Sequence, residues 1–71
     1  MSRYLVIIEE SATGFSAFLP DLPGCIATGA TRDEVENAMK DGVAFHLEGL
    51  RDSGDPVPPP RSTATYVEVA A

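Results

Sequence analysis

The chain has 71 residues, with 11 acidic and 5 basic side chains that give a formal net charge of −6, and a single cysteine. The single cysteine excludes an intrachain disulfide, and the negative charge disfavours direct binding to nucleic acid phosphates. No apolar stretch of the sequence is long enough for a signal peptide or a membrane span. A single domain of this size (residues 1–71) buries only about 60% of its unfolded surface, so we expect a homodimer or higher homo-oligomer. The absence of a targeting segment and the single free thiol predict a cytoplasmic protein.

Three strands are predicted in the first half of the chain. Residues 3–9 are rich in β-branched and aromatic side chains and are apolar on both faces, which is typical of a covered strand. Residues 10–14 contain Ser, Thr and Gly and predict a hairpin loop before a second strand at 15–19. A third, short strand is expected at 25–29, and the three form an antiparallel meander.

A rigid turn separates the second strand from the third. Pro20 and Pro23 lack an amide donor, so this segment cannot lie in a central sheet ladder. Asp21 is expected to accept hydrogen bonds from nearby backbone amides, and Gly24 to adopt a positive φ.

The strongest helix signal begins at Thr31, an N-cap residue followed three positions later by Glu34 in a capping box. The helix is expected over residues 32–52, with Gly54 as the residue that terminates it. One apolar stripe repeats at helical spacing, and Gly42 within it predicts a close approach to the sheet. The stripe consists of Val35, Ala38, Met39, Gly42, Val43, His46 and Leu50.

A proline-rich segment follows the helix, and we interpret residues 57–60 as an extended spacer rather than a ligand for an aromatic groove. Residues 63–69 alternate and predict a fourth strand that returns to pair at a sheet edge. The expected fold is therefore α+β, a small two-layer sandwich of β-β-β-α-β order with one helix on one sheet face. The other face stays uncovered, and dimerisation is one way to cover it.

The sequence contains no recognisable catalytic, cofactor or metal-binding set. His46 lies on the apolar stripe, where a core or interface role is commoner than catalysis, and Cys25 is expected to be a buried, inert thiol. Glu9, Glu10 and Asp21 could be imagined around a divalent metal, but their spacing is unspecific and a solvated loop explains the glutamates.

The order of these segments resembles the HicB family of bacterial antitoxins. The octet at residues 18–25 followed by the capping box is the most specific part, and the resemblance spans nearly the whole chain. The similar segments are residues 4–9, 14–17, 18–25, 27–31, 33–35, 37–38, 45–50 and 54–58. The resemblance implies a partly ribonuclease-H-like fold without that enzyme's active site. Many members continue into a DNA-binding domain, which we do not expect in a chain that ends at Ala71.

The function implied by the resemblance is that of an antitoxin of a type II toxin–antitoxin system, which binds a small basic HicA-like ribonuclease toxin and blocks its RNA-cleaving surface. An acidic face would replace the RNA phosphates, without catalysis, cofactor, metal or direct nucleic acid binding. The alternatives are an orphan self-assembling interaction module and, less favoured, a ribonuclease-H-like enzyme. The predicted partner-binding residues are Glu9, Glu10, Asp21 and Glu36.

Overall fold

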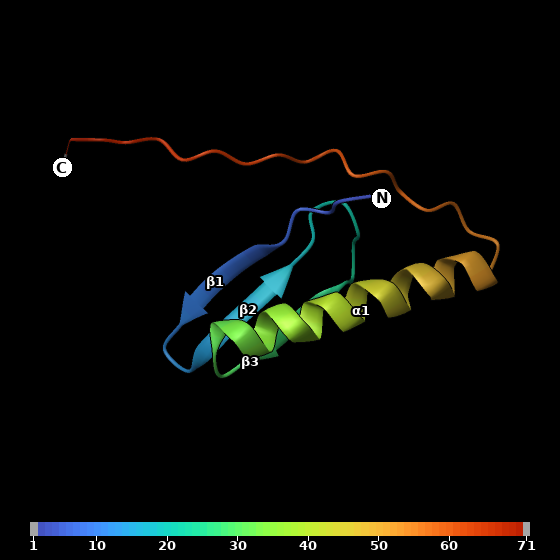
Figure 1. The fold of residues 1–71 in the computed structure, drawn as a ribbon, viewed down its shortest axis with the longest axis horizontal. Helices are drawn as coiled ribbons and strands as arrows, with labels where there is room; N and C mark the ends of the chain where they lie inside the picture. Colours follow the sequence, from blue (N-terminus) through green and yellow to red (C-terminus); the bar gives the residue numbers. More distant parts are fainter. Residues whose placement is uncertain (1, 71) are drawn as a thin grey trace.

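The computed structural model describes residues 2–70 and contains a three-stranded sheet with one helix on one of its faces (Figure 1). The elements are β1 (Ile7–Ser11), β2 (Gly14–Phe18), β3 (Ile26–Gly29) and α1 (Arg32–Asp52). The strands are antiparallel neighbours in the order β1-β2-β3. The predicted α+β class, the meander and the single covering helix are therefore confirmed.

Strand alternation gives the sheet two different faces. The cross-strand rows are Ile8–Ala17–Ala27 toward α1 and Ile7–Phe18–Ile26 on the open face. On the open face Ile26 remains 75% exposed and Phe18 39% exposed, because no element formed by residues 2–70 covers that side. The expectation of one uncovered sheet face is thus confirmed.

The turn after β2 supplies a large part of the core. Leu22 is fully buried, and it is held by two successive turns in which the Leu22 amide donates to the carbonyl of Leu19 (3.3 Å) and the Cys25 amide donates to that of Leu22 (3.2 Å). Gly24 has the predicted positive φ, at 85°. The buried residues are Ala17, Leu19, Leu22, Cys25, Val35 and Met39. The turn that contains Pro20 and Pro23 therefore both reverses the chain and contributes side chains to the core.

Both ends of α1 are capped as the sequence predicts. The Thr31 hydroxyl accepts a hydrogen bond from the Glu34 amide (3.1 Å), and the Glu34 carboxylate accepts one from the Ala30 amide (2.9 Å). At the other end Gly54 adopts a φ of 74°, which an L side chain would disfavour. The bonds of this Schellman motif run from the Gly54 amide to the Arg51 carbonyl (3.1 Å) and from the Asp55 amide to the Leu50 carbonyl (2.9 Å).

Two expectations about the helix stripe are wrong. A Cβ placed on Gly42 would meet no atom within 4 Å, so this glycine does not allow a close approach to the sheet. Ala38 is exposed, whereas Leu47, outside the predicted stripe, packs against the core. The sheet contacts only one side of the helix, centred on Val35 and Met39, so the true contact stripe is narrower and ends earlier.

Gly42→Ala is therefore expected to stabilise the protein by about 1 kcal/mol, since the substitution removes the helix-propensity cost of glycine without a clash. Urea unfolding followed by circular dichroism at a fixed protein concentration measures the change. A loss of stability would instead show that another chain packs closely against this position.

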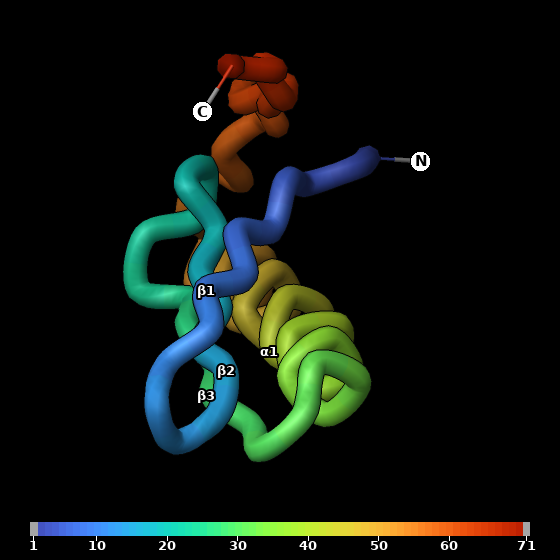
Figure 2. Tube along the Cα trace, turned by 90° about the vertical axis from the view of Figure 1, so that its left-hand side faces the viewer, coloured from blue at the N-terminus to red at the C-terminus, as the bar shows by residue number. Residues whose placement is uncertain are grey.

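The predicted fourth strand is not formed in the part of the chain that the structure describes. Residues 63–69 are extended but pair with no strand, and two perpendicular views show them away from the sheet (Figures 1 and 2). The first strand also begins at Ile7 rather than at Arg3, because its partner strand ends at Phe18, opposite Ile7. Pairing, and not propensity, decides which extended residues become strands.

Candidate functional site

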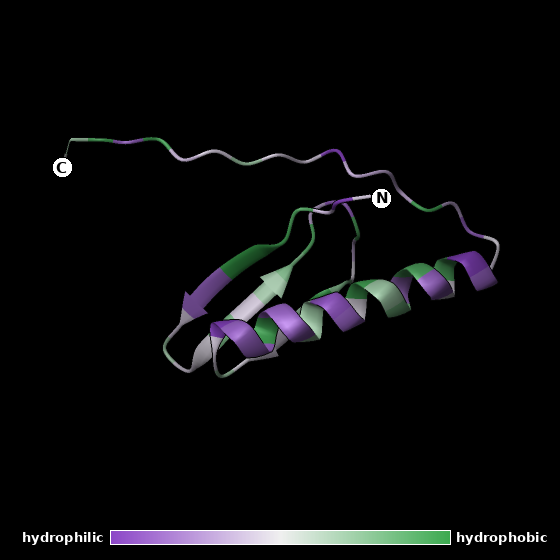
Figure 3. Cartoon of the chain, in the orientation of Figure 1, coloured by the Kyte–Doolittle hydropathy of each residue, from purple (hydrophilic) through white to green (hydrophobic). Residues whose placement is uncertain are grey.

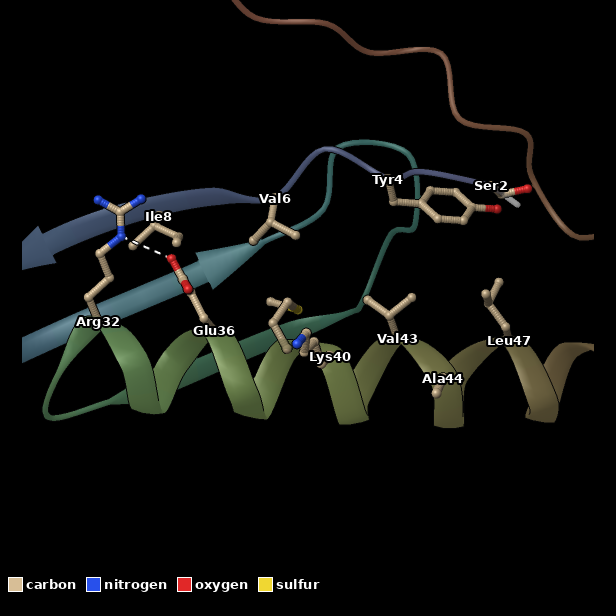
Figure 4. A pocket seen from close by; sticks show the side chains of 11 residues that line it. Ser2, Tyr4, Val6, Ile8, Arg32, Glu36, Lys40, Val43, Ala44 and Leu47 are labelled. Atoms are coloured by element: carbon tan, nitrogen blue, oxygen red, sulfur yellow. Dashed lines mark hydrogen bonds and ion pairs between the residues drawn. The ribbon is translucent and has the colours of Figure 1, made fainter.

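A groove runs between the β1 side of the sheet and α1. The helix packs mainly on β2 and β3, so the side chains of β1 and the preceding residues that point the same way are only partly covered. The groove has a volume of about 770 Å³ (Figure 4). Its apolar lining includes Tyr4, Val6, Ile8, Met39, Val43 and Leu47. The groove therefore accounts for the apolar face of the first strand that carries Tyr4, Val6 and Ile8.

Charged side chains of both signs line the helix side of the groove. Arg32 Nε lies 3.0 Å from Glu36 Oε1 in an i,i+4 pair, and Lys40 follows one turn later (Figure 4). Both members of the pair are well exposed, so the pair contributes no more than about 0.5 kcal/mol. Glu36, predicted as a partner contact, therefore stands beside an apolar groove with one oxygen already paired.

The predicted acidic contacts on β1 lie at the end of the strand that precedes the hairpin loop. Figure 3 shows β1 changing from hydrophobic to hydrophilic along its length, as Ile7 and Ile8 give way to Glu9 and Glu10. Both glutamates are exposed. Alternation places Glu10 on the same side as Ile8, toward the groove, and Glu9 on the open face in line with Ser16. Neighbours in sequence are thus divided between two surfaces.

Asp21 has a different environment, which the sequence did not indicate. Its carboxylate accepts three hydrogen bonds of 2.8 Å, from the amides of Arg61 and Ser62 and from the Ser62 hydroxyl. Nearby turn amides were the expected donors, and this expectation is wrong. The bonds to the backbone of Ser62 and Arg61 lower the pKa of Asp21 below its ordinary value of 3.8. Asp21 therefore anchors the segment that follows the helix.

Asp21→Ala is expected to release that segment while the sheet and helix stay folded, because the carboxylate is an acceptor for both amides. Amide hydrogen exchange should show faster exchange at Arg61 and Ser62. Asp41→Ala, which removes an exposed carboxylate from α1, is the control and should leave both amides unchanged. Unchanged protection in Asp21→Ala would contradict the anchoring role.

The same anchor is expected to depend on pH with a defined sign. Because the hydrogen bonds lower the pKa of Asp21, the anchoring is fully present above the ordinary value of 3.8 and is lost as the pH falls through the lower, folded-state value. Exchange protection at Ser62 should therefore persist at mildly acidic pH and disappear only in stronger acid. Loss of protection near neutral pH would contradict this assignment.

The remaining chemically active side chains are spread over the molecule. Cys25 is 6% exposed, its Sγ lies 3.9 Å from Met39 Sδ, and burial raises the pKa of its thiol, which confirms the predicted buried state. His46 is half-buried on α1. Within residues 2–70 no three His, Cys, Asp or Glu side chains lie close enough together to hold a metal ion. No helix in this same range is long and apolar enough to cross a bilayer.

Two features of the site were missed from the sequence. The groove could have been inferred from the apolar alternation of Tyr4, Val6 and Ile8, which is continued by Val43 and Leu47 on the helix. The hydrogen bond from the Tyr4 hydroxyl to the Pro58 carbonyl joins residues 54 positions apart and has no local signal.

Comparison with curated proteins gives relatives of unassigned activity. The chain is 30% identical over 64 residues to an uncharacterised 14.9 kDa protein of Haemophilus phage HP1, covering 90% of this chain and 48% of that protein. It is also 30% identical over 70 residues to a UPF0150 protein of Thermoplasma acidophilum, covering 97% and 99%. The chain therefore spans about half the length of the phage relative and nearly all of the archaeal one.

A solved structure and a family pattern identify the family of the chain. A chain of the solved HicA3 and HicB3 toxin–antitoxin complex superposes with a TM-score of 0.71 at 32% identity, covering 83% of this chain and 70% of that one. The pattern of the HicB-like antitoxins of bacterial toxin–antitoxin systems matches residues 4–70. The chain thus shares its overall architecture with a chain of that complex, and it belongs to the HicB-like antitoxin family.

Proposed function

We propose that this protein is the antitoxin of a type II system and binds and blocks a small, basic, HicA-like ribonuclease toxin. The observation that carries the proposal is the match, at 32% identity, to a chain of a solved HicA3–HicB3 complex. The family pattern over residues 4–70 supports the same role. The protein would act in the cytoplasm, where such a toxin meets RNA, and by binding alone, without catalysis, cofactor or direct contact with nucleic acid.

Electrostatic complementarity supports this mode of binding. The net charge of −6 attracts a basic partner at long range and accelerates the encounter. Exposed carboxylates can then occupy the positions at which an RNA-cleaving surface expects phosphates. We propose Glu9, Glu10 and Glu36 as direct contacts. Glu36 lies at the helix side of the groove, and Glu10 lies on the same face of β1 as Ile8.

Asp21 has a different role in the proposal. Its carboxylate already binds Arg61 and Ser62, and these bonds would have to break before it could bind a toxin. We therefore expect Asp21 to contribute by fixing the segment after the helix rather than by direct contact.

The test is a titration of the full chain against the HicA-like ribonuclease encoded beside its gene, with RNA cleavage and complex mass as the two measurements. The chain should inhibit cleavage at a fixed stoichiometry. The double variant Glu9→Lys and Glu10→Lys should weaken inhibition, while Glu48→Lys, an exposed charge reversal on α1, should change it little. High salt should also weaken the complex of the wild-type chain with the toxin, because salt screens the attraction between their charges.

Two other outcomes would redirect the assignment. Absence of both binding and inhibition would favour the orphan self-assembling module. Metal-dependent cleavage of RNA by the chain alone would favour the ribonuclease-H-like enzyme. Equal loss of inhibition in Glu9→Lys with Glu10→Lys and in Glu48→Lys would retain the antitoxin role but contradict the proposed contacts.

A further inference from the structure

The segment of residues 63–69 has the composition of a strand but no partner within its own chain. It alternates Thr, Thr, Val and Val on one side with Ala, Tyr and Glu on the other. Its large apolar side chains are almost entirely in solvent, with Tyr66 101%, Val67 77% and Val69 78% exposed. β-Branched and aromatic residues at such exposure are a cost to a free chain and a ready template for strand pairing.

The base of this segment is fixed, which sets its direction. Pro58 accepts a hydrogen bond from the Tyr4 hydroxyl, and Arg61 and Ser62 are held by the carboxylate of Asp21. Beyond this anchor the chain runs outward, and both perpendicular views show it separated from the sheet (Figures 1 and 2). The strand-forming residues are thus carried away from their own β1 by a segment that is itself bound to the domain.

The same chain presents an acceptor for such a strand. β1 is an outer strand of the sheet, paired only with β2, so one of its edges is open. Beside that strand lies the apolar groove, with Val6 and Ile8 on one wall and Val43 and Leu47 on the other. The opposite outer strand, β3, also has one open edge, but it is the strand that packs most closely against α1. Each chain therefore has one strand-like segment without a partner and, at β1, an open sheet edge beside an apolar groove.

We propose that residues 63–69 of one copy pair with the open edge of β1 in a second copy, and that the exchange is reciprocal in a twofold dimer. Both copies then complete a four-stranded sheet, and the same two surfaces are used twice, as a closed symmetric interface requires. In this arrangement Val67 and Val69 enter the partner's groove, and Tyr66 extends the apolar row of Ile7 and Phe18 on the open face. The proposal concerns self-assembly and does not depend on the antitoxin role.

Sedimentation and amide hydrogen exchange of the full chain at several concentrations provide the test. The expected result is a dimer whose exchange protection at residues 63–69 falls as dilution dissociates it. The double variant Val67→Asp and Val69→Asp should weaken the dimer by about tenfold or more and expose these amides. The control, Asn37→Asp with Ala38→Asp, adds the same charge at exposed helix positions and should leave the dimer intact.

Each contrary result would overturn the proposal. A monomer at all concentrations, whether its 63–69 amides are protected or free, means that the strand pairs with its own β1 or with nothing. A dimer that survives the double aspartate variant uses a different surface, such as the open sheet face. Protection that arises only after a ribonuclease is added assigns the segment to the toxin.

Discussion

Leu22→Ala is expected to cost about 2–5 kcal/mol of unfolding free energy, a large loss for a domain of this size. Leu22 is 0% exposed, and it packs with Val35 and Met39 between the turn and the helix. A core of this size rarely supplies more than about 3–5 kcal/mol in total, so the variant should be partly or wholly unfolded at room temperature. Urea unfolding monitored by circular dichroism measures the change.

The control for this prediction is a truncation of equal or greater size at the surface. Phe45 lies on α1 and is 78% exposed, so Phe45→Ala should change stability by less than about 0.5 kcal/mol. Leu22→Met, which keeps the volume, should cost less than about 1.5 kcal/mol and allows measurement if the alanine variant does not fold. Similar losses in Leu22→Ala and Phe45→Ala would show that the turn is not part of the core.

Gly14→Ala is expected to destabilise the protein by about 1–3 kcal/mol, by a backbone mechanism rather than by loss of packing. Gly14 has a φ of 151°, and a Cβ there would lie 2.5 Å from the carbonyl oxygen of Gly29. Since that oxygen belongs to the backbone of β3, only a shift of the strand could relieve the clash. Chemical denaturation at one fixed protein concentration gives the free energy.

Gly42→Ala provides a matched comparison, because the same atom is added where it meets nothing. The two variants should change stability in opposite directions, with Gly42→Ala gaining about 1 kcal/mol. If Gly14→Ala were also neutral or stabilising, β3 would have to be free to move away from the hairpin, and the close approach of the strands would not be required by the fold.

Features with a local cause were predictable from the sequence. The helix bounds, the Thr31 cap and the Gly54 terminus depend on residues within a few positions of one another, and all three are confirmed. The first three strands were also located, although their ends differ by up to four residues. Strand ends depend on the partner, as Ile7 shows by marking the point at which β2 ends.

Features that depend on distant residues could not be predicted in this way. Asp21 in a proline-flanked turn has the sequence of a local acceptor, yet its partners lie 40 and 41 positions away. Gly42 has the spacing of a packed position, but no atom lies within 4 Å of the place that a Cβ would take there. The strand character of residues 63–69 was recognised, while the edge that would accept it depends on how the domain is assembled.

The candidate site was predictable in composition and not in arrangement. The four acidic residues were selected because a basic partner requires negative charge, and the structure gives each of them a different setting. Glu9 lies on the open face of β1, Glu10 lies on its other face, Glu36 lines the groove, and Asp21 binds the segment after the helix. Net charge indicates the kind of partner, whereas strand alternation decides which charges can act together.

The unequal lengths of α1 and the sheet have a consequence for the dynamics of the molecule. A helix of 21 residues is about 31 Å long, whereas strands of five residues span only about 17 Å. The residues of α1 that are fully buried, Val35 and Met39, both lie in its first half. We therefore expect the second half of α1 to open at lower free energy than the first. A cooperative core and a loosely held helical arm thus coexist in one short chain.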